Sequence, residues 1–97
     1  MKAKLLFKDK IVYSDGTILA LRAWSVPKTA AMPEGVKYSL AYIDKEGKRV
    51  LGYDNAEGKG HHRHERKLET PFSFESIESL TNRFLKEISE RRRGHED

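Results

Sequence analysis

The last quarter of the chain carries the pattern that most restricts its fold. Five apolar residues recur there at the spacing of one helix face: Ile77, Leu80, Phe84, Leu85 and Ile88. Ser76 precedes them as an N-cap, Glu78 complements the positive end of the helix dipole, and Gly94 marks the end. The pattern predicts a helix over 76–92 whose stripe is buried in the core, each side chain contributing roughly 1.5–3 kcal/mol. A helix that binds a partner through the same stripe is the alternative.

Residues 3–54 alternate in the manner of β-strands. Apolar and β-branched runs at 4–7, 11–13, 17–24, 36–43 and 49–53 are separated by turn signals or, at Lys8–Lys10, by charge. Gly16 is free to take the positive φ of a hairpin turn. Even-numbered residues of the run 17–24 share one face and odd-numbered residues the other. We therefore predict an α+β fold, an antiparallel meander of four to five strands with the C-terminal helix packed on one face. Residues 71–74 would add a short edge strand or cover the core.

Length and composition bound the class of protein. The chain has 97 residues and no cysteine, so we expect a single domain over 1–97, ending in a short tail at 93–97, without disulfides or thiolate zinc sites. No run approaches the ~20 apolar residues of a membrane span, and the charged start is not a signal peptide. These features predict a cytoplasmic protein with no membrane contact.

Charge is distributed unevenly along the chain, whose net charge is +4. Residues 1–54 and 55–67 are both basic, whereas 68–90 are acidic. This polarity fits a polyanion such as RNA on one side and a basic partner on the other, although an ordinary solvated surface is also consistent with it.

Residues 55–70 are predicted to form a basic, histidine-rich loop. Gly58 and Gly60 are too flexible for a helix or a central strand, and His61, His62 and His64 follow among arginines. Such a segment cannot present an apolar face to a core, so we expect it to be exposed for contact. A solvated polar loop whose histidines have no role is the simpler interpretation.

The residue types in this loop match those needed to cleave RNA without a metal. Histidine exchanges protons near neutral pH, and attack by a 2′-hydroxyl needs a base, an acid and cations for the phosphate. We predict His62 and His64 as the acid/base pair, Arg63 and Lys59 as the phosphate ligands, and Asp54 as the residue that orients a histidine. No cofactor and no metal are expected, and Tyr53 or Trp24 could stack a base.

Two other functions remain open at this stage. A metal-dependent hydrolase could use His62 and His64, with Asp54, Glu65 or His61 as further ligands, although the usual zinc motifs are missing. Alternatively, a non-catalytic module could inhibit RNA or a protein by occupying it, and its binding should then weaken steeply with salt.

Several strings resemble the TumE family of toxin–antitoxin proteins. They are Leu51–Asn55, Gly58–Gly60, His62–His64, Pro71–Phe72 with Phe74 and Ser76, Ala3–Leu6, Lys10–Val12, Asp15–Gly16 and Lys37–Tyr38. The resemblance covers about residues 1–90. This chain has His61 where many relatives have an aspartate, so the resemblance gives His61 no required role.

The resemblance implies a toxin of a type II module, encoded beside a helix-turn-helix antitoxin that neutralises it and represses the operon. Toxins of this size commonly act on RNA or on translation. The resemblance assigns no active residues beyond the strings quoted above. The RNA target and a homodimeric state are not determined by the sequence.

Overall fold

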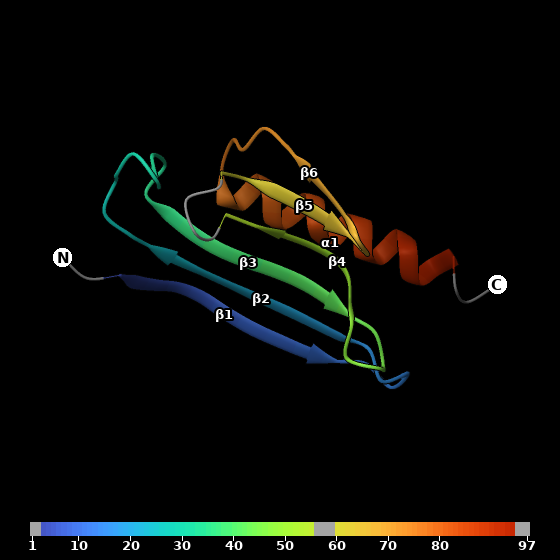
Figure 1. Cartoon of the computed structure of the whole chain (residues 1–97). Helices are drawn as coiled ribbons and strands as arrows, with labels where there is room; N and C mark the ends of the chain where they lie inside the picture. Colours follow the sequence, from blue (N-terminus) through green and yellow to red (C-terminus); the bar gives the residue numbers. More distant parts are fainter. Residues whose placement is uncertain (1–2, 56–59, 95–97) are drawn as a thin grey trace.

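The structure is a six-stranded antiparallel meander with one helix packed on one face, and it confirms the predicted α+β class (Figure 1). This computed structural model describes residues 3–55 and 60–94. The strands lie in the sheet in the order of the chain. They are β1 (Lys4–Val12), β2 (Ile18–Ser25), β3 (Val36–Ile43), β4 (Arg49–Asp54), β5 (His62–Glu65) and β6 (Leu68–Pro71), and they are followed by the helix α1 (Ile77–Gly94).

One face of the sheet forms the core with α1. Leu19, Leu21 and Ala23 of β2 are buried, whereas the even-numbered side chains between them point to the opposite, helix-free face, as the alternation predicted. The buried residues that form the core are Leu19, Leu21, Ala23, Tyr38, Leu40, Tyr42, Val50, Leu51, Tyr53, Leu80, Phe84 and Ile88. The sheet therefore has one covered face and one face open to solvent.

The helix confirms its predicted position but not all of its predicted stripe. Ser76 caps it, since the Ser79 amide donates to Ser76 Oγ at 3.0 Å. Leu80, Phe84 and Ile88 are buried, whereas Leu85 is 38% exposed, so the prediction that Leu85 belongs to the core is wrong. Leu85 follows Phe84 directly and is therefore rotated about 100° away from the centre of the buried stripe.

Strand β1 is continuous through Lys8–Lys10, where the sequence suggested a break. It pairs with β2 along its length, with a bulge between Leu5 and Phe7. Most of its side chains are exposed on both faces, because it lies at the edge of the sheet beyond the part that α1 covers (Figure 1). Charged residues on such an edge meet water on either side and do not interrupt the ladder.

The prediction of a loop over 55–70 is wrong for residues 62–70. These residues form most of the hairpin β5–β6, which extends the sheet beyond β4 and brings the total to six strands instead of four or five. The last strand is β6 instead of the optional strand at 71–74. Phe72 and Phe74 instead pack against the core, the second of the two roles considered for that segment.

Candidate functional site

The alternation of β5 separates the residues that the sequence places side by side. Arg63 lies opposite Tyr53 of β4, and His62 lies opposite Asp54. Tyr53 is fully buried and packs edge-on against Phe84 of the helix, so Arg63 projects on the helix side. His62 and His64 project on the helix-free face.

On the helix-free face, both imidazoles lie beside carboxylates of neighbouring strands. His64 Nε2 is 3.1 Å from Asp54 Oδ2, and His64 Nδ1 is 3.5 Å from Glu69 Oε2. His62 Nδ1 is 3.7 Å from the other oxygen of Glu69. The side chains of His62 and His64 are 21% and 13% exposed, and the nitrogens His62 Nδ1 and His64 Nε2 are themselves buried. We call Arg49, Asp54, His62, His64 and Glu69 the histidine–carboxylate cluster.

Asp54, which we predicted would orient a histidine, lies beside His64. The 3.1 Å separation from His64 is that of an ion pair, but His64 Nε2 is not aligned for a hydrogen bond. Asp54 Oδ2 also accepts a hydrogen bond from Arg49 Nη1 at 3.3 Å. The carboxylate is thus shared between a guanidinium and an imidazole, which holds these two side chains close together.

Gly52 makes room for this arrangement. A Cβ atom at position 52 would lie 2.9 Å from Arg49 Cδ and 2.9 Å from the Leu40 carbonyl oxygen, which is closer than real contacts allow. The missing side chain lets Arg49 cross the sheet surface toward Asp54. A glycine inside a strand often marks such a close approach, and this was the one sequence signal pointing to Arg49. No feature of the sequence pointed to Glu69, because its place beside the histidines depends on the register of three strands.

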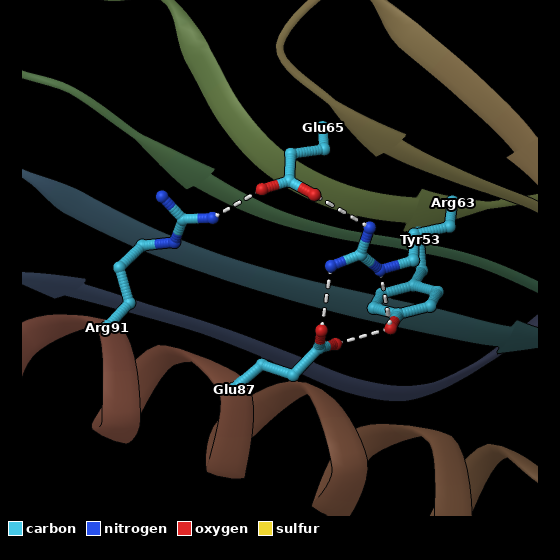
Figure 2. Close-up of polar contacts among 5 residues, drawn as sticks. All are labelled: Tyr53, Arg63, Glu65, Glu87 and Arg91. Atoms are coloured by element: carbon cyan, nitrogen blue, oxygen red, sulfur yellow. Dashed lines mark hydrogen bonds and ion pairs between the residues drawn. The ribbon is translucent and has the colours of Figure 1, made fainter.

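Arg63 belongs to a second network, between the sheet and the helix (Figure 2). Its guanidinium donates to Tyr53 Oη at 3.1 Å, to Glu65 Oε1 at 3.0 Å and to Glu87 Oε2 at 2.8 Å. Glu65 also accepts from Arg91 at 3.0 Å, and the Tyr53 hydroxyl donates to Glu87. The prediction that Arg63 shares a pocket with the two histidines is wrong, because adjacent residues of a strand face opposite sides of the sheet.

The pKa shifts in this network agree with a structural role. Burial and the hydrogen bond to Glu87 raise the pKa of Tyr53. Burial alone would lower the pKa of Arg63, but hydrogen bonds to Glu87, Glu65 and Tyr53 outweigh it and raise the pKa. Hydrogen bonds from Arg63 and Arg91 lower the pKa of Glu65. The charges therefore persist around neutral pH and hold α1 to β5.

Replacing Arg63 with alanine should destabilise the fold without removing the histidine–carboxylate cluster. The change leaves Glu87 without its charged partner, and we expect a decrease of about 2–3 kcal/mol in the free energy of unfolding, measured by urea denaturation. Lys67→Ala, in the exposed turn of the same hairpin, is the control and should change stability by less than about 0.5 kcal/mol. If Arg63→Ala kept full stability but lost activity, Arg63 would instead contact the substrate.

His61 is held in an aromatic stack away from the cluster. Its Nδ1 is 2.8 Å from the Tyr38 hydroxyl, its Nε2 is 3.0 Å from Glu34, and its ring stacks on Phe74 with centroids 4.4 Å apart. These contacts tie the loop before β3 to the start of β5 and explain His61 as a structural residue.

The two candidates for base stacking differ in accessibility. Tyr53 is fully buried, so the prediction that it could stack a base is wrong. Trp24 is half-buried on the helix-free face, where Arg22 lies 5.7 Å from its ring centroid. Trp24 remains available for stacking.

The remaining predicted ligands are not gathered at one point. Lys59 lies outside the described residues. Among residues 3–55 and 60–94, no group of three or more histidine, aspartate or glutamate side chains is arranged to hold a metal ion. Glu65 and His61, considered as metal ligands with the other histidines, are turned away in the contacts described above.

A comparison with known protein families places the chain among the toxins. The matching family model, described as Toxin TumE, covers residues 2–92. The chain therefore belongs to the TumE toxin family, as the strings quoted above suggested. No curated protein and no solved structure is significantly similar to the chain.

The helix α1 does not have the length and apolar character of a membrane span, and it is the one helix in the described part of the chain.

Proposed function

We propose that this toxin binds RNA on the helix-free face of the sheet and cleaves it by metal-independent acid/base catalysis. The observation that carries the proposal is the placement of His62 and His64 on one face of β5, each beside a carboxylate. The proposal includes the setting implied by the family, in which the toxin belongs to a type II module with a helix-turn-helix antitoxin and acts in the cytoplasm.

In the proposed reaction, one imidazole removes the proton of a ribose 2′-hydroxyl while the oxygen attacks the adjacent phosphorus. The other imidazole donates a proton to the departing 5′-oxygen. The products are a 2′,3′-cyclic phosphate and a free 5′-hydroxyl. Asp54 and Glu69 stabilise whichever imidazole is protonated, and Arg49 supplies positive charge where negative charge builds on the phosphate.

The surface leading to the cluster suits a nucleic-acid strand. Across the helix-free face, paired residues form a row in which Ala20, Ala41 and Gly52 lie between Lys10 and His64. Ala20 and Ala41 line a hollow of about 530 Å³ over β1–β3. Lys8, Lys10 and Arg22 line it, and the one acidic residue of the lining, Asp9, lies opposite Leu21 and so has its side chain toward the helix side. A phosphate backbone could therefore lie there and reach the cluster.

Analysis of the products tests the chemistry directly. Purified protein is incubated with single-stranded RNA in excess chelator, and the new 3′ ends are identified by mass spectrometry. Cyclic phosphates formed in chelator are the expected result. Cleavage that stops in chelator would point to a metal-dependent hydrolase, and 3′-hydroxyl ends would contradict attack by the 2′-oxygen.

The basic face also predicts how RNA binding responds to salt. Lys37 is exposed and lies opposite Trp24, so it shares the helix-free face with Arg22. Arg22→Gln with Lys37→Gln should flatten the dependence of log K on log salt by about 0.7 for each phosphate that is no longer neutralised. Fluorescence anisotropy with a labelled RNA measures this slope. The control, Lys45→Gln with Lys86→Gln, neutralises two exposed lysines elsewhere and should leave the slope unchanged.

A module that inhibits by occupancy is the second candidate, because the basic hollow could hold RNA without any help from the histidines. In that case RNA would bind with the same salt dependence and remain intact.

A further inference from the structure

The outer edge of β1 carries exposed apolar side chains toward both of its ends, and the rest of the described chain leaves this edge uncovered. Within that part of the chain β1 pairs with β2 alone, so its outward N–H and C=O groups have no strand beside them. Four large apolar side chains on this strand are strongly exposed: Leu5 at 53%, Leu6 at 47%, Ile11 at 47% and Val12 at 65%. Lysines and a bulge, which this strand also has, blunt an edge against indiscriminate pairing. The exposed apolar side chains on either side of the central charges still indicate an interaction site.

A groove on the helix side continues this surface. It has a volume of about 470 Å³ and lies between the end of the first hairpin and α1. Leu19, Leu85 and Ile88 provide apolar walls, and Arg92 and Arg93 lie at the same site. The exposure of Leu85, which helical periodicity assigned to the core, is explained if a partner covers this groove.

The charges on the edge are mainly basic. Lys4, Lys8 and Lys10 belong to β1, whereas Asp9 is the one acidic residue of that strand. Lys8 and Lys10 lie opposite Arg22 and Ala20 of β2 and so share the helix-free face with them, while Asp9 points to the helix side. An acidic strand added here would place carboxylates opposite Lys8 and Lys10.

A second copy of the chain fits this edge poorly. Two β1 strands paired antiparallel about a two-fold axis must place some residue opposite its own copy. If that residue is Lys8, Asp9 or Lys10, at the middle of the strand, like charges face each other and destabilise the pair. If the two copies paired about a residue nearer the N-terminus, the bulge between Leu5 and Phe7 would lie in the paired region and disrupt its hydrogen bonds.

We infer that β1 is a docking edge for an extended segment of another protein, in which acidic and apolar residues alternate. The segment adds a seventh strand, its carboxylates meet Lys8 and Lys10, and its apolar side chains pack beside Ile11 and toward the groove at Leu85. The inference does not rest on the RNA chemistry proposed above. Lys8 and Lys10 also line the hollow proposed for RNA, so a bound segment and RNA compete for these two lysines.

A charge-swap experiment tests the assignment without RNA. The probe is a fluorescein-labelled peptide as long as β1, in which glutamate alternates with valine, and its matched partner carries lysine in place of glutamate. The wild-type protein should prefer the acidic peptide by roughly tenfold or more, and Lys8→Glu with Lys10→Glu should reverse that preference. Lys45→Glu with Lys48→Glu, in the exposed turn after β3, is the matched control and should keep the wild-type preference.

Hydrogen exchange locates the binding. With the acidic peptide bound, the added protection should fall on the outward amides of β1. The inference is overturned if neither peptide binds or if protection appears on another element. It is also overturned if the substitutions at Lys45 and Lys48 change the peptide preference as much as those at Lys8 and Lys10. It is also overturned if sedimentation shows a dimer whose β1 amides are protected without peptide, since a second copy would then occupy the edge. Each of these failures would leave the roles of His62 and His64 unaffected.

Discussion

Replacing both His62 and His64 with alanine is expected to lower the rate of RNA cleavage by at least roughly 10²–10⁴-fold. The two imidazoles are the groups of the cluster whose reference pKa allows proton exchange near neutral pH, and no neighbouring side chain can take over both steps. Single-turnover cleavage in chelator measures the rate. Growth after expression without antitoxin provides the parallel measurement in cells, and the double variant should be tolerated where the wild type is toxic.

A second double variant separates chemistry from folding. His62→Gln with His64→Gln keeps polar side chains of similar size in β5 but cannot relay protons, so it should lose cleavage to the same extent. Its unfolding curve should stay close to that of the wild type, and it should still bind RNA. If either double variant cleaved RNA and arrested growth as the wild type does, the histidines would have no catalytic role.

The other large effect is expected at Phe84. This ring has no exposed surface and packs against Tyr53 with centroids 5.8 Å apart. Phe84→Glu puts an unpaired carboxylate between helix and sheet and removes a large apolar side chain, and each change alone costs several kcal/mol. Because a small domain has only about 5–15 kcal/mol of stability, we expect the variant not to fold. Circular dichroism during urea titration should show no cooperative transition.

Leu85→Glu is the matched control for this prediction, since it makes the same chemical change at the adjacent residue. Leu85 is 38% exposed, so its carboxylate can remain in water and the protein should still fold cooperatively. A folded Phe84→Glu protein, or an unfolded Leu85→Glu protein, would contradict the burial described for α1.

Hydrophobic periodicity predicted the helix and the strands from β2 to β4 because one side of each is buried. It failed for β5–β6, where both faces are polar. His62 and His64 meet carboxylates on one face, while Arg63 and Glu65 form ion pairs on the other. Side chains on the two faces differ in their chemistry but not in their polarity, so a hydropathy pattern shows no alternation in these strands. In addition, no glycine marks the turn between them.

The residues of the candidate site were predicted only in part, because the sequence did not show that residues 62–65 form a strand. Asp54, His62 and His64 come together as expected, since β4 and β5 are neighbours. Arg63 was assigned to the wrong side because a loop lets adjacent residues converge and a strand does not. Arg49 and Glu69 reach the cluster from β4 and from β6, and their positions follow from strand register, which local sequence does not reveal.

The strictly sequential order of the strands has a consequence for how the molecule forms. Each strand pairs with the strand that precedes it in the chain, so the strands can assemble one after another as the polypeptide is synthesised, at low cost in loop entropy. The apolar side of the sheet stays exposed to water until α1, which follows all six strands in the chain, packs over it. We therefore expect nascent chains truncated before residue 77 to remain protease-sensitive and harmless, so that the cell meets a working toxin only after α1 has been synthesised. Resistance to protease in such a truncated chain would show that the sheet needs no helix to fold.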